Sequence, residues 1–499
     1  MSRPLPPSLV NLELKPDSRV PIYQQLFGQL RGMILNGELA SGTRLPATRE
    51  IAKLIQCSRS TVLLAFEMLM NEGYVEARQG SGTYVVDTVP EDAIGCRSTS
   101  AAPDKMPAGV RLSTTASALL DLDIPKSLLP HSRVIFPDVR EFPFGTWSAL
   151  FRSAWKQPEA DLLGPHDPMG YLPLRRVIAD YLRDIRGLIC DPEQIAITSG
   201  TSHGLNLLFQ LLLSPGDQVV LEDPSAPWMV AKAIACGAQP LFIPVDGEGI
   251  CLDANSEAAS GARLAVVTPS HQFPLGYVLS QRRRTALLNW AQRNDAWIIE
   301  DDFDSEFRFA GRPLPPLYTA DQSCRVFYMA TFSKILIPNI RLGYIVLPPQ
   351  FVESYSRLRA IVDRYTSLQL QPVVASFIED GHYASHLRRM RALYEGRQNT
   401  LLALAERYLP ELLRFEPQDG GMHSVGWLLD SLPHNISAAR LADLANKAGI
   451  PLSPLSTYCH RFPRPEAVLF GYARYSQGEI SYIMQKLADL TGCKGREAG

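Results

Sequence analysis

The chain has 499 residues, which is too long for one ordinary hydrophobic core and therefore predicts two or three domains. Its composition, 46% hydrophobic and 20% charged, is typical of a soluble globular protein, and its net charge of −2 excludes a global attraction to nucleic acid or to a membrane. The sequence contains no apolar run near the roughly 20 residues that span a bilayer and no apolar signal-peptide core at its start. Its eight scattered cysteines form no CxxC pair, so we expect a cytoplasmic protein with reduced thiols and no metal site.

Residues from about 10 to 86 are predicted to form a small unit of three helices followed by a hairpin. Helices are expected from Pro21 to about Leu35 and from Thr48 to Ile55. Ser58 can cap a third helix that runs from Arg59 to about Asn71. The four- and three-residue spacings in this third helix predict one buried face, formed by Val62, Phe66 and Leu69.

The glycine-rich stretch from residue 73 to 86 predicts two short strands around a tight turn. Three helices followed by a hairpin are typical of a winged helix-turn-helix, in which the amino end of the second motif helix meets base edges. Arg59 and Ser60 lie at that position, and Arg49 lies at the start of the preceding helix. A small protein-interaction module with solvated arginines is the alternative that charge alone leaves open.

The order of four motifs in this unit resembles the GntR-type winged helices. These motifs are R-L-P-A-T-R-E-I-A, S-R-S-T-V, L-M-N-E-G-Y-V and G-S-G-T-Y-V. The resemblance implies binding to a double-stranded DNA operator through Arg49, Ser58, Arg59, Ser60 and the wing residue Gly80. Where some members of the family carry a further basic residue, four positions after Arg59, this chain has Leu63.

Residues from about 87 to 118 are rich in Ser, Thr, Pro and Ala and show no apolar period, which predicts a flexible linker. A flexible chain of this length has a root-mean-square span of roughly 30 Å. That reach permits the winged helix to lie on a partner subunit.

From about 119 to 495, predicted strands alternate with predicted helices, which indicates an α/β domain with a mainly parallel sheet. A strand over 194–198 meets a turn of small residues and then a helix over 205–213. The turn contains Gly200, Thr201 and Ser202, whose N–H groups and hydroxyls at a helix start can bind a phosphate.

Further predicted strands, over 218–222, 264–267 and 296–300, also end in polar turns. His271 lies in the second of these turns, and Asp301 begins the third. Because the carboxyl ends of parallel strands meet at one edge of a sheet, we expect these turns to open on one face.

The next predicted strand, over 325–330, leads into the segment T-F-S-K and then into R-L-G. Lys334 can form a Schiff base with an aldehyde, and the hydroxyls of Thr331 and Ser333 together with Arg341 can hold a phosphate. This combination suits a phosphorylated aldehyde. The alternative is an ordinary surface lysine and arginine after a strand.

The same stretch, with the order of the polar turns before it, resembles the fold-type I aminotransferases that use pyridoxal 5′-phosphate (PLP). It is most similar to the MocR/GabR-type regulators, which join a GntR-type winged helix to an aminotransferase-like domain. Sequence spacing cannot distinguish the four acids at positions 300, 301, 302 and 304, and the resemblance selects Asp301 as the partner of the pyridine nitrogen. The full cofactor set that the resemblance implies is Lys334, Asp301, Arg341, Thr331, Ser333, Gly200, Thr201, Ser202 and His271.

Several positions depart from the pattern of the active enzymes. Ala226 stands where an aromatic ring usually covers the pyridine, with Trp228 two residues on, and Phe303 stands where many regulators have a tyrosine. Leu469 occupies the place of the arginine that holds a substrate carboxylate, and Arg474 is out of register. Since losing such a charge-assisted contact costs about 1.5–3 kcal/mol, we expect PLP binding without efficient transamination, and we assign no catalytic residue.

These observations predict a dimeric transcription regulator of the MocR type that senses PLP, or a PLP adduct of a small amine or amino acid. A homodimer is expected because two-fold operators match two-fold proteins. Two alternatives remain at this point: a PLP-dependent aminotransferase with an accessory DNA-binding domain, and a PLP-free regulator whose large domain only dimerises.

Overall fold

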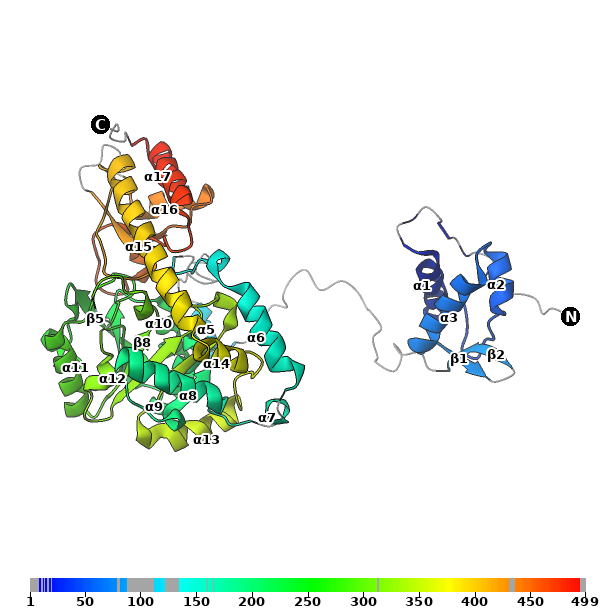
Figure 1. The fold of residues 1–499 in the computed structure, drawn as a ribbon, viewed down its shortest axis with the longest axis horizontal. Coiled ribbons are helices and arrows are strands. Elements are labelled where there is room, and N and C mark those ends of the chain that lie inside the picture. Colours follow the sequence, from blue (N-terminus) through cyan, green and yellow to red (C-terminus); the bar gives the residue numbers. More distant parts are fainter. Residues whose placement is uncertain are drawn as a thin grey trace. The chain divides into compact units, whose positions relative to one another are not determined.

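The computed structural model describes residues 9, 12, 14–15, 18, 20–78, 81–87, 112–120, 122, 134–158, 160–164, 166–311, 314–429 and 436–493. The chain divides into two compact units, Met1–Arg111 and Leu112–Gly499 (Figure 1). Each unit contains its own cluster of buried apolar side chains, as expected for domains that fold around separate cores.

The smaller unit has the predicted order of three helices and a hairpin. Its elements are α1 (Ile22–Leu35), α2 (Thr48–Leu54), α3 (Arg59–Asn71), β1 (Val75–Arg78) and β2 (Gly82–Val85). The two strands pair antiparallel, with Val75 opposite Val85 and Arg78 opposite Gly82. The predicted face of α3 is confirmed, because Val62, Phe66 and Leu69 are all buried in the core of this unit.

A short helix, α5 (Thr114–Leu120), lies where the sequence suggested the end of a linker. None of its side chains is buried, and it lies against α10 (Pro227–Ala235) of the larger unit. The boundary between the two units falls just before this helix, at residues 111 and 112.

The described part of the larger unit is built around an eight-stranded sheet. In spatial order its strands are β3 (Ile195–Thr198), β10 (Gly343–Val346), β9 (Val326–Thr331), β8 (Trp297–Asp302), β7 (Ala262–Val267), β4 (Gln218–Asp223), β5 (Gln239–Asp246) and β6 (Gly249–Ile250). Strands β9, β8, β7, β4 and β5 run parallel, while β10 is antiparallel to both of its neighbours and β6 is antiparallel to β5. The predicted, mainly parallel sheet is therefore confirmed.

The central strands consist almost entirely of buried residues, which is why they appear in the sequence as short apolar runs. Helices accompany the sheet, as crossovers between parallel strands require (Figure 1). Besides α5 and α10, the helices of the larger unit are α6 (Phe144–Lys156), α7 (Ala160–Leu163), α8 (Leu172–Tyr181), α9 (Thr201–Leu212), α11 (Gln281–Arg293), α12 (Leu317–Ala320), α13 (Val352–Val362), α14 (Gln371–Glu379), α15 (His382–Tyr408), α16 (Ala438–Lys447) and α17 (Gln477–Thr491).

A second, smaller lobe of this unit contains a four-stranded antiparallel sheet. Its strands, in spatial order, are β11 (Leu413–Phe415), β12 (Ser424–Leu428), β14 (Ala467–Phe470) and β13 (Ser453–Pro454). The 27-residue helix α15 leads from the large sheet into this lobe, where it packs against α17 (Figure 1). The lobe therefore stands over one end of the large sheet.

In the described part of the chain, none of the helices combines the length and the apolar character that crossing a membrane would demand.

Candidate cofactor site and nucleic-acid interface

The register of three neighbouring strands brings the predicted site residues of the larger unit together. Gly343 on β10 pairs with Thr198 on one side and with Thr331 on the other. The turns that follow Thr198 and Thr331 therefore meet the residues that precede Gly343, which include Arg341. A Cβ atom at Gly343 would lie 2.7 Å from the carbonyl oxygen of Ala330, so only glycine permits this close approach.

Lys334 lies just beyond the carboxyl end of β9, and its amine nitrogen Nζ donates a hydrogen bond of 2.8 Å to the carbonyl oxygen of Ile135. Burial lowers the pKa of Lys334 to about 8, although the carboxylates of Asp304 and Asp301 favour the charged form. Arg341 adds to the lowering by repulsion. A lysine whose pKa is near neutrality can supply the uncharged amine that attacks a carbonyl carbon.

Two of the four acids at the end of β8 have structural partners. Glu300 accepts hydrogen bonds from the backbone N–H groups of Leu317 (2.8 Å) and Tyr318 (3.0 Å) at the start of α12. Asp302 forms a buried ion pair of 2.6 Å with Arg186. Both carboxylates therefore tie the sheet to elements around it.

The other two acids differ from each other. Asp304 lies 2.9 Å from the ring nitrogen Nδ1 of His271, and both side chains are buried. The oxygen Oδ1 of Asp301 is buried without a hydrogen-bond partner among the described residues. Burial, followed by repulsion from Asp302 and Asp304, raises the pKa of Asp301 to about 7. Of these four acids, Asp301 is therefore the one with an oxygen still able to accept a hydrogen bond from a ligand. The sequence alone could not identify which acid this would be.

Arg341 forms a cationic cradle with the start of α9. The guanidinium of Arg341 lies so close to Gly200 that a Cβ atom added to this glycine would be 3.7 Å away from it. The guanidinium therefore lies at the first turn of α9. Gly200 has a φ of +90°, and the N–H groups of Thr201 and Ser202 that follow have no acceptor within the helix. A guanidinium beside the positive end of a helix is unfavourable unless an anion lies between them, so this cradle suits a phosphate or a carboxylate.

The two hydroxyl residues before Lys334 have separate roles in the turn. Thr331 donates from Oγ1 to the carbonyl oxygen of Leu342 and accepts from the N–H of Ser333 at 3.1 Å, so it holds the turn itself. The Oγ atom of Ser333 is buried without a hydrogen-bond partner among the described residues. Ser333 is therefore the hydroxyl in this turn that can still serve a ligand.

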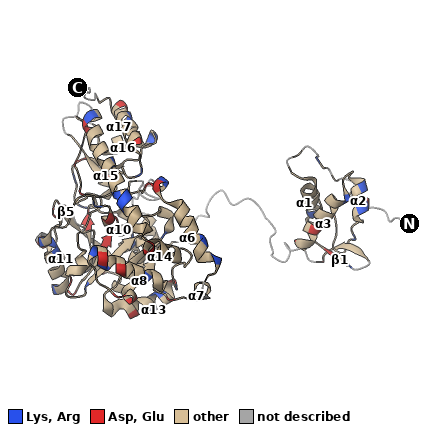
Figure 2. Cartoon of the chain, viewed as in Figure 1, with Lys and Arg blue, Asp and Glu red and all other residues tan. Residues whose placement is uncertain are grey.

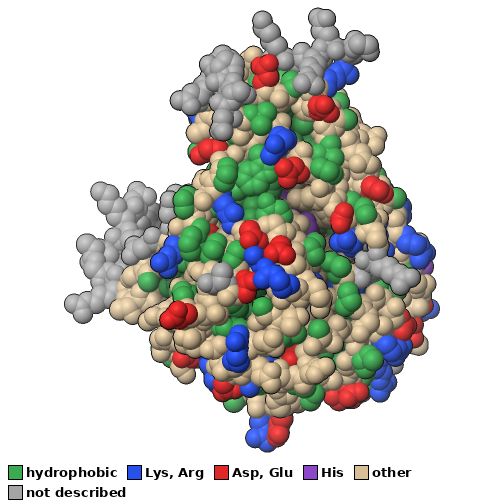
Figure 3. Space-filling view, turned by 90° about the vertical axis from the view of Figure 1, so that its left-hand side faces the viewer, with side chains coloured by type: hydrophobic (Ala, Val, Ile, Leu, Met, Phe, Trp, Pro, Cys, Tyr) green, Lys and Arg blue, Asp and Glu red, His purple; other side chains and the backbone are tan. Residues whose placement is uncertain are grey.

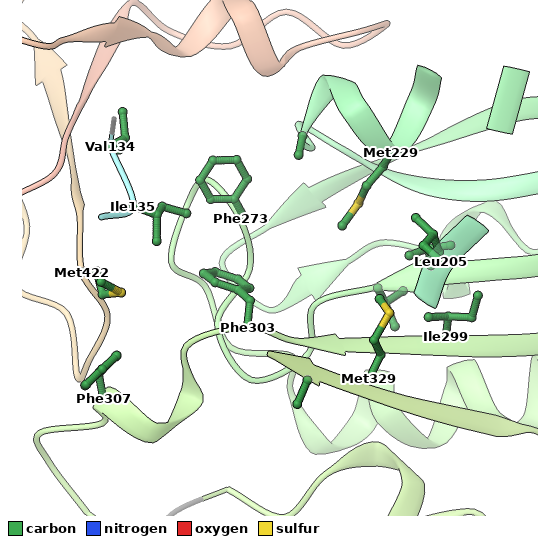
Figure 4. Close-up of a cluster of buried hydrophobic side chains, with 14 of the residues drawn as sticks. Val134, Ile135, Leu205, Met229, Phe273, Ile299, Phe303, Phe307, Met329 and Met422 are labelled. Atoms are coloured by element: carbon green, nitrogen blue, oxygen red, sulfur yellow. The ribbon is translucent and has the colours of Figure 1, made fainter. Parts of the chain in front are cut away.

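An apolar wall includes Ile135, whose carbonyl oxygen accepts the hydrogen bond from Lys334. Figure 4 shows Ile135, Phe273 and Phe303 close to one another, and the rings of Phe273 and Phe303 lie 6.1 Å apart in an edge-to-face arrangement. Sequence reasoning missed Ile135, which lies 199 residues from Lys334. The sequence pattern marked Phe303 only as a position where many regulators have a tyrosine, and it gave no signal for Phe273. No local motif could have revealed this wall, because its members come from separate turns.

The positions that depart from the enzyme pattern have ordinary packing roles. Ala226 and Leu469 are buried in the core, and Trp228 is half-buried on α10. The guanidinium of Arg474 lies over the rings of Phe136 and Tyr475, at 5.4 and 5.2 Å from their centres. Arg474 is thus engaged with these rings and does not replace the substrate-binding arginine for which Leu469 stands on β14.

The predicted DNA contacts that the structure describes lie at exposed positions on α2, at the cap of α3 and at the start of α3. Ser58 caps α3 by accepting a hydrogen bond of 3.1 Å from the N–H of Thr61. Arg59, Ser60 and Arg49 are exposed, and the Nε atom of Arg59 lies 3.4 Å from the hydroxyl of Thr48. Figure 2 shows basic residues on α2. The predicted wing contact, Gly80, lies outside the described residues.

Two leucines on α3 stand out from the otherwise polar exposed side of this helix. Leu63 and Leu64 expose 46% and 47% of their surface. Leu63 lies one turn after Arg59 and therefore on the same side of α3. The sequence identified Leu63 only as a departure from the basic residue of some relatives, and its exposure makes it a candidate for base contact.

Comparisons with known proteins agree with this division. The model of the family described as bacterial regulatory proteins, gntR family, matches residues 22–85. The chain is 38% identical over 465 residues to the probable rhizopine catabolism regulatory protein MocR of Rhizobium meliloti, covering 93% of this chain and 92% of that protein. It is 31% identical over 483 residues to the HTH-type pyridoxine biosynthesis transcriptional regulator PdxR of Corynebacterium glutamicum, covering 96% and 98% of the two chains.

The solved structures similar to the chain include aminotransferases. The kynurenine aminotransferase of Pyrococcus horikoshii matches with a TM-score of 0.65 and 24% identity, over 77% of this chain and 95% of that chain. LysN of Thermus thermophilus, an α-aminoadipate aminotransferase, matches with a TM-score of 0.67 and 23% identity, over 76% and 97% of the two chains. At these identities the likeness concerns the fold, and it confirms the predicted aminotransferase-like fold.

Proposed function

The chain belongs to the MocR-type transcription regulators, and from this membership we propose that it binds PLP at Lys334 and couples that binding to operator recognition. The observation that carries the proposal is the unpartnered oxygen of Asp301, which shares its surroundings with the amine of Lys334. The relative PdxR is named as a regulator of pyridoxine biosynthesis, which supports a response to a compound of the vitamin B6 group.

The residues of the site fit PLP in three ways. Lys334 would hold the cofactor covalently, and Asp301 would accept a hydrogen bond from its pyridine nitrogen. Arg341 and the first turn of α9 would hold its phosphate. When bound, the cofactor supplies an electrophilic carbon that captures a primary amine.

We further propose that the effector is a small amine or amino acid that reaches this site, and that turnover of it is inefficient. Ile135, Phe273 and Phe303 form a buried apolar wall (Figure 4), and the carbonyl oxygen of Ile135 holds the amine of Lys334 beside it. Leu469 offers no charge to a substrate carboxylate, so a bound amine would be held without the contact that orients substrates in the enzymes. Sensing rather than repeated conversion is the result expected of such a site.

The proposed assembly is a homodimer that acts on double-stranded DNA in the cytoplasm. A winged helix reads a short half-site, so two copies are needed to read a two-fold operator. Operator binding should be followed by fluorescence anisotropy while PLP and a panel of amines are added. A change in operator affinity that needs both PLP and an amine would support the proposal, whereas multiple-turnover conversion of an amino donor would contradict it.

Substitution of Asp301 by asparagine is expected to weaken PLP binding by roughly tenfold to a hundredfold. The change keeps the size of the side chain and removes the charge, and a hydrogen bond to a charged group contributes about 1.5–3 kcal/mol. Equilibrium dialysis with PLP measures the effect, and Asp184→Asn, at an exposed acid on the surface of the larger unit, is the matched control. An affinity within about twofold of that of the wild type would remove Asp301 from the site.

Leu63 is expected to contact the methyl group of a thymine in the operator. The thymine methyl is the apolar group that the major groove presents, and an exposed leucine on a recognition helix has no hydrogen bond to offer there. Exchange of that thymine for uracil removes one methyl group, which corresponds to about 0.8 kcal/mol or roughly a fourfold loss of affinity. The wild type should lose this affinity, whereas Leu63→Ala should bind both duplexes equally.

The experiment uses an operator selected from random duplexes, with single thymine-to-uracil exchanges at each position. Leu35→Ala, at another exposed leucine of the same unit, serves as the control and should respond to uracil as the wild type does. Equal sensitivity of the wild type and Leu63→Ala at every position would show that Leu63 does not contact a thymine methyl.

A further inference from the structure

A cavity of about 320 Å³ lies between the large sheet and the smaller lobe of the same unit. Residues from the turn after β7, from the segment after β8 and from the strand β12 of the lobe line it. Figure 3 shows one face of the larger unit, where acidic and basic side chains surround the junction of the two lobes. The volume is at the lower end of the range, about 300–1,000 Å³, of sites that bind small molecules.

This cavity adjoins the surroundings of Lys334, because Asp304 borders both, but the lysine itself does not line it. Its lining includes neither Lys334 nor Asp301 nor Arg341. His271 and Asp304, which bind each other, form part of its wall. His271, which the sequence assigned to the cofactor, thus faces this second cavity.

The charges of the lining leave one carboxylate in excess. Asp304 is paired with His271, and Arg308 is paired with Asp419 at 2.9 Å. Glu416 has no basic partner within the lining, and its salt bridge of 3.3 Å runs to Arg414, outside the cavity. The lining therefore carries an excess negative charge, which Arg414 offsets from outside the cavity, and this excess favours a cationic occupant.

Two aromatic residues of the lining accompany Glu416. Tyr277 comes from the turn after β7, and its pKa is raised by burial and by the neighbouring Glu416. Trp427 and Val425 both line the cavity, as expected for residues two apart on one face of β12. A carboxylate and aromatic rings that line the same cavity are the combination that binds organic ammonium ions, through charge and through the faces of the rings.

A buried polar atom in the same lining also lacks a partner. The Oγ atom of Ser270 makes no hydrogen bond within the described residues, although Ser270 is only 9% exposed. An unsatisfied hydroxyl at this depth costs free energy unless a ligand or water reaches it. A ligand with a hydroxyl or an N–H group would supply the missing hydrogen bond to Ser270.

We propose that this cavity binds a small organic ammonium ion at a site separate from Lys334. Glu416 supplies the opposite charge, Trp427 and Tyr277 cover the ammonium group, and Ser270 takes a hydrogen bond from the body of the ligand. The regulator then has two places at which small molecules can act.

Choline is a suitable probe, because its quaternary nitrogen carries no hydrogen and cannot react with an aldehyde. Isothermal titration calorimetry of the full-length protein should show saturable choline binding in the wild type and equally in Lys334→Ala. Glu416→Gln and Trp427→Leu are each expected to weaken binding by roughly threefold to tenfold. Glu411→Gln removes the same charge from an exposed position outside the cavity and should leave the affinity unchanged.

Three results would overturn the proposal: no saturable heat with choline, loss of binding in Lys334→Ala, or wild-type affinity in Glu416→Gln. Glu416 lies on an exposed segment, so its variant keeps the test valid even if Trp427→Leu does not fold. Because Lys334→Ala is expected to retain choline binding, failure of the PLP proposal and failure of this one give different results.

Discussion

Replacement of Lys334 by alanine is expected to abolish the covalent retention of PLP completely. The amine of Lys334 has a pKa of about 8 and lies beside Asp301 and Asp304, so it is the nucleophile that this site provides. The remaining contacts at Arg341 and α9 are non-covalent and cannot survive denaturation. The measurement is mass spectrometry of protein that has been incubated with PLP, reduced with borohydride and denatured, which detects the added mass on the chain.

Lys156→Ala, at an exposed lysine at the end of α6, is the control and should keep the added mass. Peptide mapping of the wild type should place the modification on Lys334. If Lys334→Ala retains one stoichiometric modification, the assignment of the cofactor lysine is wrong.

Replacement of Arg186 by alanine is expected to destabilise the larger unit by about 3–5 kcal/mol. Arg186 and Asp302 form an ion pair of 2.6 Å, in which the two side chains are only 2% and 1% exposed. Asp302 also accepts a hydrogen bond of 2.7 Å from the hydroxyl of Tyr328. Without the guanidinium, a carboxylate remains buried with one neutral donor, which is the costly outcome for a broken buried pair.

Urea denaturation followed by tryptophan fluorescence measures this effect, because all six tryptophans of the chain lie in the larger unit. Arg183→Ala is the matched control, since Arg183 lies three residues earlier and is 54% exposed with exposed acidic partners. Its cost should stay within the roughly 0–1 kcal/mol typical of surface salt bridges. Equal denaturation midpoints for the two variants would contradict the role given to the buried pair.

The double variant Arg186→Met, Asp302→Leu tests whether the loss of stability comes from the carboxylate that is left buried without its arginine. Removing both charges leaves no uncompensated carboxylate, and apolar replacements of a buried pair are often neutral. We therefore expect the double variant to be more stable than Arg186→Ala alone. Because Asp302 adjoins Asp301, the double variant should also lower the pKa of Asp301, since repulsion from Asp302 helps to raise it.

The sequence was sufficient for features that depend on local patterns. Ser58 as the cap of α3 and Val62, Phe66 and Leu69 as its buried face follow from residue type and helical spacing. The ends of β9 and β3, with Lys334 and Gly200 in the turns after them, follow from short buried runs that stop at small polar residues. Helix starts were less precise, since α9 begins at Thr201 and not near residue 205.

Features that depend on which elements become neighbours needed the tertiary structure. Antiparallel β10 between β3 and β9 places the guanidinium of Arg341 over Gly200, and no spacing along the chain encodes that register. The carbonyl oxygen of Ile135 receives the amine of Lys334 across 199 residues. Such contacts arise from the order of strands in the sheet.

The sequence by itself therefore determined the two kinds of domain and the residues that follow each strand, because apolar period, caps and turn residues act over a few positions. Only the tertiary structure decided which of four adjacent acids keeps a free oxygen. Packing gave Glu300 two backbone donors, Asp302 an arginine and Asp304 a histidine, and left Asp301 without a partner among the described residues. Long-range packing assigns hydrogen-bond partners, and the acid that it leaves unpaired is the one available to a ligand.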